Sequence, residues 1–150
     1  MIVERLHELG LVLPAAFPPA GNYLACTVDG GLVHVGGHGP IDGETIITGK
    51  VGGDLTLEQG RLAARLTALS ILATLEAEIG LDRIDRIVKV FGMVNVAPGF
   101  NQTPAVIDGC SDLLVQVFGE AGRHSRSAVG MAELPFDIAV EIELVARLVA

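Results

Sequence analysis

The chain of 150 residues is poor in aromatic side chains and in positive charge. It contains no tryptophan and one tyrosine, and aromatics make up 4% of the sequence. Aromatic rings are the platforms on which single-stranded bases stack, so their scarcity matters. Ten Lys and Arg stand against eighteen Asp and Glu, for a formal net charge of −8. The sequence has no cluster of basic side chains that could bind a phosphate backbone. These absences argue against a nucleic-acid partner.

Long apolar runs are also missing, although half of the residues are hydrophobic. No stretch of about 18 uninterrupted apolar residues is present, so we expect no membrane span. The opening MIVERLHELG carries acidic side chains at a helical spacing, unlike a signal peptide. Cys26 and Cys110 show neither CxxC nor metal-ligand spacing, which predicts reduced, buried thiols. We therefore expect a cytoplasmic protein.

Motifs for metal, nucleotide and nucleophilic chemistry are absent as well. The segment GGHGP, residues 36–40, contains neither GxGxxG nor the lysine of a phosphate loop. Its glycines favour a tight turn or a ligand close to backbone N–H groups. His34, His38 and His124 are not spaced like metal ligands, and no serine stands in GxSxG. The sequence predicts no metal and no cofactor.

The first part of the chain predicts a helix, a connector and a hairpin. Residues 1–18 comprise a short amphipathic helix, ended by Gly10, and a proline-rich connector. The run YLACTVDGGLVHVGGHG predicts two strands joined at Asp29-Gly30-Gly31. A turn near residues 41–43 then leads into a loop or a short strand.

A long helix is predicted next. Thr56, with Gln59 three residues later, has the pattern of a capping box, and Gly80 marks the helix end. The expected buried stripe consists of Leu62, Leu66, Leu69 and Ala73.

A strand, a second helix and a final strand follow. Apolar alternation begins at Ile87, and Thr103 is the expected N-cap of a helix with Pro104 at its first position. Gly119 or Gly122 should end that helix. In the final strand one face is expected to be apolar and the other charged. The apolar set is Phe136, Ile138, Val140, Ile142, Leu144 and Leu148, and the charged set is Asp137, Glu141, Glu143 and Arg147.

This order predicts one α+β domain over residues 1–150. The expected architecture is an antiparallel or mixed sheet with both long helices on one face, which makes two layers. The other sheet face still carries many apolar residues and needs a cover. Small sheets with a bare apolar face usually associate with copies of themselves. We therefore expect a homo-oligomer.

Two charged residues near the C-terminus are candidates for chemistry. Arg126 precedes the small-residue run SAVG; it is either a surface side chain or a planar fork that holds a carboxylate through two hydrogen bonds. Glu141 lies in the final strand on the face away from the helices. It is either exposed or, at an interface, able to transfer protons with a raised pKa. Periodicity alone leaves both alternatives open.

The C-terminal RSAVGMAELPFDIAVEIELVA strongly resembles the signature of the YjgF-like family, the reactive-intermediate deaminases (RidA). In that signature an Arg-Ser segment leads through small residues and a Leu-Pro to a strand with Glu-Ile-Glu. The resemblance extends to GNYLACTVDGGLVHVGGHGP and to the segment that begins at Gly80-Leu81. It covers most of residues 20–148.

This resemblance implies a chorismate-mutase-like fold and a homotrimer whose sheets line a central barrel, with ligand clefts between subunits. It also implies hydrolysis of enamines and imines to 2-keto acids and ammonia without cofactor or metal. Arg126 matches the arginine that grips the substrate carboxylate, and Glu141 matches the carboxylate that positions or activates water. Tyr23 matches the tyrosine that closes the cleft. Backbone N–H groups near Gly36 and Gly37 are expected as further donors.

The chain departs from the family pattern at three positions. Gly36 stands where the family has a serine, Ala128 where it has a cysteine, and Pro104 where it has an asparagine. The sequence is more similar to a divergent subgroup that carries the old endoribonuclease L-PSP label. The alternative to a deaminase is therefore a non-catalytic trimer that binds small carboxylate metabolites in a regulatory or protective role.

Overall fold

The hairpin predicted at Asp29-Gly30-Gly31 is present. In the computed structural model, which describes residues 1–150, β1 (Cys26–Asp29) pairs antiparallel with β2 (Leu32–His38). Gly30 and Gly31 have φ angles of 57° and 80°. Two successive positive φ angles are what a two-residue type I′ hairpin turn requires. The local sequence therefore fixes this edge of the sheet.

The main sheet is mixed and has the strand order β1-β2-β7-β5-β6. At its centre, β7 (Val140–Leu148) runs antiparallel to β2 and to β5 (Ile84–Asn95). β6 (Ser125–Met131) lies at the far edge, parallel to β5. A separate two-stranded ribbon joins β3 (Ile41–Asp42) and β4 (Thr45–Ile46).

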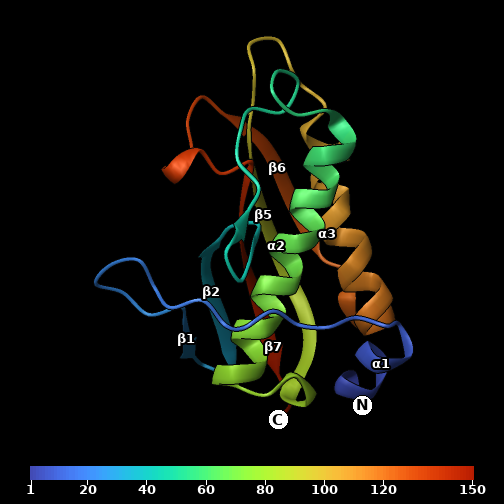
Figure 1. Cartoon of the computed structure of the whole chain (residues 1–150). Helices are drawn as coiled ribbons and strands as arrows, with labels where there is room; N and C mark the ends of the chain where they lie inside the picture. The colour runs from blue at the N-terminus through green and yellow to red at the C-terminus, as the bar shows by residue number, and fades with distance from the viewer.

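Two long helices, α2 (Leu57–Glu78) and α3 (Thr103–Phe118), cover one face of the sheet side by side (Figure 1). The short α1 (Ile2–Glu8) lies against α3, where the Arg5 side chain donates a hydrogen bond to the Gln116 carbonyl. No helix covers the other sheet face (Figure 1). The predicted two-layer α+β architecture is confirmed.

The predicted boundaries of α2 are confirmed, but its predicted buried stripe is only partly so: Ala73 is buried, whereas Leu62 is not. The Gln59 N–H donates to the Thr56 hydroxyl at 3.1 Å, and the Thr56 N–H donates to the Gln59 side chain at 2.8 Å. Leu62 is 59% exposed, whereas the buried face consists mainly of small residues such as Ala63, Ala64 and Ala68. Small side chains occupy the first part of this face, where α3 approaches α2 closely at Gly109, whereas Ile71, Leu72 and Leu75 are buried further along the helix.

The start of α3 also differs from its prediction by one residue. Gln102 is the N-cap, and the Thr103 hydroxyl instead donates to the Ala128 carbonyl of β6 at 3.0 Å. A tertiary hydrogen bond therefore replaces the expected cap. Pro104 stands in the first turn and Gly119 ends the helix, both as predicted.

The final strand alternates as predicted, but it is shorter. Val140, Ile142 and Leu144 are buried against the helices, while Glu143 is exposed. Phe136 lies outside the strand, in a 3-10 turn over Pro135–Asp137, and is 81% exposed. Its assignment to the buried face was wrong, because the chain turns before the strand begins.

Neither cysteine is paired in a disulfide. Cys110 is fully buried, and burial raises the pKa of its thiol to about 12, although the charge of Arg126 acts in the other direction. Cys26 is only partly buried. None of the helices combines the length and apolar character needed to cross a membrane.

Gly109 of α3 is the point at which the two long helices approach most tightly. A Cβ atom there would overlap the carbonyl oxygen of Arg61 in α2. Gly109→Ala should therefore lower the free energy of unfolding by about 1–3 kcal/mol, measured by urea denaturation. Helix propensity alone would change it by about 1 kcal/mol in the opposite direction. The control Val115→Ala, on the outer face of α3, should change it by about 0.5 kcal/mol or less.

Candidate functional site

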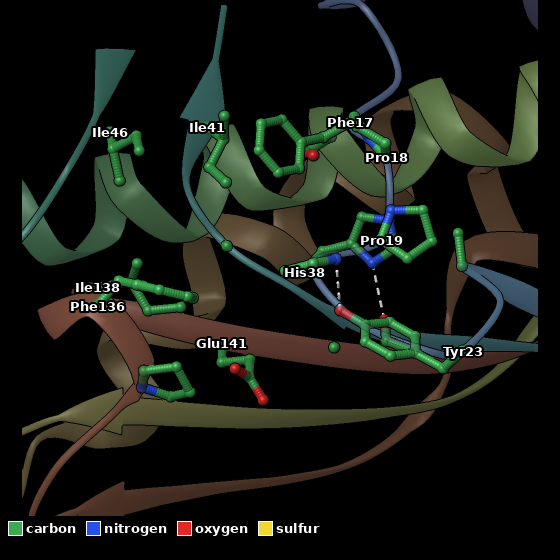
Figure 2. A pocket seen from close by; sticks show the side chains of 17 residues that line it. Phe17, Pro18, Pro19, Tyr23, His38, Ile41, Ile46, Phe136, Ile138 and Glu141 are labelled. Carbon is green, nitrogen blue, oxygen red and sulfur yellow. Dashed lines mark hydrogen bonds between the residues drawn. The ribbon is translucent and has the colours of Figure 1, made fainter. Parts of the chain in front are cut away.

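A cavity of about 330 Å³ lies at the edge of β2, beyond the part of that strand that pairs with β1. The connector after α1 runs from the α3 side of the molecule to the β1 edge and forms one wall (Figure 1). Figure 2 shows side chains from this connector and from the turn before β7 converging on the cavity. α2 contributes Ser70, and the β3–β4 ribbon contributes Ile41 and Ile46.

Four of the five predicted site residues line this cavity. They are Tyr23, Gly36, Gly37 and Glu141. Tyr23 lies in the connector with 56% of its surface exposed, and its hydroxyl accepts a hydrogen bond from the Ala20 N–H at 3.2 Å. The structure therefore brings together residues that are more than a hundred positions apart in the sequence.

Glu141 projects from β7 on the face away from the helices, because its neighbours Val140 and Ile142 are buried on the helix side. Its carboxylate lies against the backbone of Gly37, where an added Cβ atom would be 2.7 Å from Oε2. Burial, and secondarily the charge of Glu143, raise the pKa of the Glu141 carboxyl. No donor from the chain offsets this rise by hydrogen bonding. The carboxyl is therefore free to exchange a proton with a ligand or a water.

His38 forms part of the cavity wall in its neutral form. Its Nδ1 donates to the Gly36 carbonyl at 2.7 Å, since a carbonyl can only accept, and its Nε2 accepts from the Thr74 hydroxyl at 2.8 Å. Burial lowers the pKa of the imidazole, although the hydrogen bond to Gly36 acts in the other direction. His38 thus ties β2 to α2.

Several cavity residues were not predicted from the sequence. Ser70 is buried in α2 with 3% exposure, and Phe17 and Phe136 form aromatic walls. The turn that carries Phe136 has positive φ angles at Phe136 and Asp137, 58° and 56°. Sequence periodicity could not identify these residues, because two lie in irregular segments and Ser70 is one of many small residues in α2.

Arg126, the fifth predicted site residue, does not line the cavity. It lies on the edge strand β6, opposite Val90, and its side chain points to α3. Its Nη1 donates to the Asp108 carboxylate at 2.8 Å and to the Ser111 hydroxyl at 3.1 Å. Within one chain, Arg126 and Glu141 therefore lie on opposite faces of the sheet and do not share a cleft.

A second histidine, His124, is linked to Arg126 through the Ser111 hydroxyl, to which both side chains are hydrogen-bonded. The Nδ1 of His124 donates to the Gly122 carbonyl at 2.6 Å, and its Nε2 accepts from the Ser111 hydroxyl at 2.9 Å. The Nη2 of Arg126 donates to the Pro104 carbonyl at 3.3 Å. A guanidinium has five N–H donors, so Nε and one N–H of Nη2 keep no partner within the chain.

Nowhere do three or more His, Cys, Asp or Glu side chains converge as they would around a metal ion. His34 and His38 lie on β2, and His124 lies just before β6. His38 and His124 are each hydrogen-bonded to a helix hydroxyl.

Residues 3–148 match the family described as "YjgF/chorismate mutase-like, putative endoribonuclease". The chain therefore belongs to this family. Protein TCP17 of Trypanosoma cruzi is 43% identical over 150 residues, which is 98% of this chain and 94% of that protein.

Two solved structures have the same fold. The protein Atu1372 of Agrobacterium tumefaciens, described as of unknown function, is 42% identical with a TM-score of 0.91, covering 99% of this chain and 92% of its own. The YjgF gene product of E. coli is 25% identical with a TM-score of 0.64, covering 91% of this chain and 98% of its own.

The raised pKa of Glu141 predicts a pH-dependent effect of Glu141→Gln. As the pH rises above the ordinary value of 4.5, the folded chain retains a proton that the unfolded chain has released. Wild-type stability therefore falls as the pH rises through the pKa of the folded state. Glu141→Gln removes this dependence and should be more stable than wild type near pH 7, but not near pH 4.

Urea denaturation at both pH values measures this difference. Glu44→Gln, which neutralises an exposed carboxylate in the β3–β4 turn, is the control and should not reproduce it. If the free energies of unfolding of Glu141→Gln and wild type differ by the same amount at both pH values, the effect is one of packing and not of ionisation.

Proposed function

We propose that this protein hydrolyses the enamine and imine forms of 2-imino acids to 2-keto acids and ammonia. The observation that carries the proposal is the carboxyl of Glu141, which has a raised pKa and no donor from its own chain, at the wall of a ligand-sized cavity. Such a group can take a proton from water and return it to the leaving nitrogen. The resemblance of the C-terminal segment to the reactive-intermediate deaminases supports the same reaction.

The reaction needs a water molecule, a group that transfers protons and a group that binds the substrate carboxylate. An enamine first becomes the imine by gaining a proton at carbon and losing one from nitrogen. Water adds to the C=N carbon, and the proton that it loses passes through Glu141 to nitrogen, which gives a carbinolamine. The hydroxyl proton of the carbinolamine then passes through Glu141 to the amino group, the C=O bond forms, and the C–N bond breaks to release ammonia.

The Gly36 N–H already donates to the Ala25 carbonyl at 2.9 Å, so the expected donor at Gly36 is not free, and Gly37 remains the candidate for a backbone donor to the substrate. Tyr23 is in a position to cover the ligand from the connector.

We assign binding of the substrate carboxylate to Arg126 of a neighbouring subunit. Arg126 lies at the β6 edge of the sheet, and the cavity lies toward the opposite edge. In a closed ring of copies, a heterologous interface brings one edge of a subunit against a different surface of the next. The trimer that we propose would complete each cavity in this way. The two free N–H donors of Arg126 would then bind the carboxylate.

The second candidate function is a non-catalytic trimer that binds small carboxylates. One observation favours it: Arg126 is already paired with Asp108, so a ligand would have to share the guanidinium with a carboxylate of the chain. Gly36 and Ala128 also bring no side-chain hydroxyl or thiol to the site. This function needs Arg126 but not proton transfer at Glu141.

Ribonuclease activity, which the family description names, is less compatible with this chain. The net charge of −8 and the single tyrosine provide little for an RNA backbone or for stacked bases.

The first test of the proposal is a coupled assay. An amino-acid oxidase generates 2-imino acids in the presence of semicarbazide, and a deaminase diverts them from semicarbazone to free keto acid. Arg126→Ala should lower kcat/KM by about 10- to 100-fold, which corresponds to the loss of a charged hydrogen-bond pair. The control Arg61→Ala removes another Arg–Asp pair, between Arg61 of α2 and Asp112 of α3, and should retain activity. Full activity of Arg126→Ala would contradict the assignment.

Co-expression of Arg126→Ala with Glu141→Gln tests whether the site is shared between subunits. Each variant alone should have about a tenth of wild-type activity or less. If arginine and glutamate come from adjacent subunits, about one site in four in a random mixture has both, so about a quarter of wild-type activity should return. No recovery, in mixed trimers verified by native mass spectrometry, would contradict a site shared between Arg126 and Glu141 of adjacent subunits.

A further inference from the structure

We infer that the cavity selects 2-imino acids with bulky, uncharged and apolar side chains, of four or more carbon atoms, over the smallest ones. This inference rests on the proposed function and names its substrate class. It concerns the part of the ligand that enters the cavity, whereas the carboxylate is assigned to Arg126 outside it.

The walls of the cavity are mostly apolar. Carbon-rich side chains come from three separate segments of the chain: Phe17, Pro18 and Pro19; Ile41 and Ile46; and Pro135, Phe136 and Ile138. No lysine or arginine lines the cavity, and Glu141 is its one acidic residue. A ligand carboxylate inside it would face Glu141 without a counter-charge, so the apolar end of the ligand is the end that fits.

The size of the cavity also favours a long side chain. Its volume of about 330 Å³ is at the lower end of the range found for ligand pockets. A methyl side chain would leave most of this space to water, which finds few polar partners between apolar walls. A branched or aromatic side chain would displace that water and cover the walls.

Ser70 provides one hydroxyl at the α2 wall of the cavity. It is 3% exposed. The one carboxyl of the cavity, Glu141, is assigned to proton transfer at the C=N group, so an ammonium or guanidinium side chain would compete with the reacting group for it. A single hydroxyl is too little to compensate such a charge, because burying an unpaired charge is costly. The expected substrates are therefore uncharged at the end that enters the cavity.

The exposed aromatic walls are held in place. Phe136 is 81% and Phe17 is 45% exposed in the absence of a ligand. The left-handed backbone conformation of Phe136 and Asp137 is unfavourable for residues other than glycine, but hydrogen bonds from the Asn95 side chain stabilise it. The Asn95 side chain donates to the Asp137 carboxylate at 3.0 Å and to the Ile138 carbonyl at 3.1 Å. A ligand side chain would cover apolar surface that the fold itself keeps exposed.

The affinities of 2-keto acids, the products of the proposed reaction, test this inference by isothermal titration. Pyruvate, 4-methyl-2-oxopentanoate and phenylpyruvate share the same head group, so differences among them report on the side chain. Each additional methyl or methylene group that is buried contributes about 0.8 kcal/mol to the free energy of binding. The three extra carbons of 4-methyl-2-oxopentanoate should therefore strengthen binding by about 50-fold relative to pyruvate.

A variant of the connector tests whether this cavity is the cause. Phe17→Ala should reduce the preference for 4-methyl-2-oxopentanoate over pyruvate by about tenfold. The control Val12→Ala truncates an 85% exposed residue of the same connector that does not line the cavity, and should leave the preference unchanged. Equal effects of both variants would overturn the assignment to this cavity.

The failure of this inference can be told apart from the failure of the proposed function. Equal turnover of imines from alanine, leucine and arginine would overturn the selectivity and leave the deaminase intact. Selective binding of bulky keto acids without any imine hydrolysis would support the cavity's ligand class and overturn the deaminase. Equal affinity for pyruvate, 4-methyl-2-oxopentanoate and 5-guanidino-2-oxopentanoate would overturn the inference whatever the catalytic result.

Discussion

The alternation of side chains along β7 is the constraint on which both the layers and the candidate site depend. Val140, Ile142 and Leu144 fill the space beneath the helices. Glu141 and Glu143 must therefore lie on the other face, where their mutual repulsion adds to the effect of burial on Glu141. A slip of one residue would place two carboxylates in the core. The hydrophobic core thus fixes the position of the candidate acid.

Two neutral histidines connect strands to helices in the same manner. His38 joins β2 to Thr74 of α2, and His124, just before β6, joins Ser111 of α3. In each case one ring nitrogen bonds a carbonyl two residues earlier in the chain. The two contacts stabilise opposite parts of the sheet, one beside the cavity and one beside Arg126. Of the candidate groups, Glu141 and Arg126 therefore lie on strands of a braced sheet, whereas Tyr23 lies in the connector.

Features fixed by neighbouring residues were predictable from the sequence, and features fixed by distant ones were not. The Gly30-Gly31 turn, the Thr56 cap and the outward face of Glu141 each follow from a few adjacent positions. The exposure of Leu62 could not be predicted, because it depends on how closely α3 approaches. The role of Phe17 in the cavity wall could not be predicted from hydrophobic periodicity, because an irregular connector has no regular repeat. The resemblance to a family located Tyr23, Gly36 and Gly37, but a single chain does not bring Arg126 to them.

The strand order has a consequence for how this chain folds. β7 lies at the centre of the sheet, between β2 and β5, yet it is the last of the strands to be synthesised. Until residues 140–148 are available, the β1–β2 hairpin has no neighbour and β5 lacks its main partner. Pairings between such distant segments are slow to form, because chain entropy must be lost first. The sheet can therefore be completed only late in synthesis, and until then the exposed edges of β2 and β5 are open to aggregation.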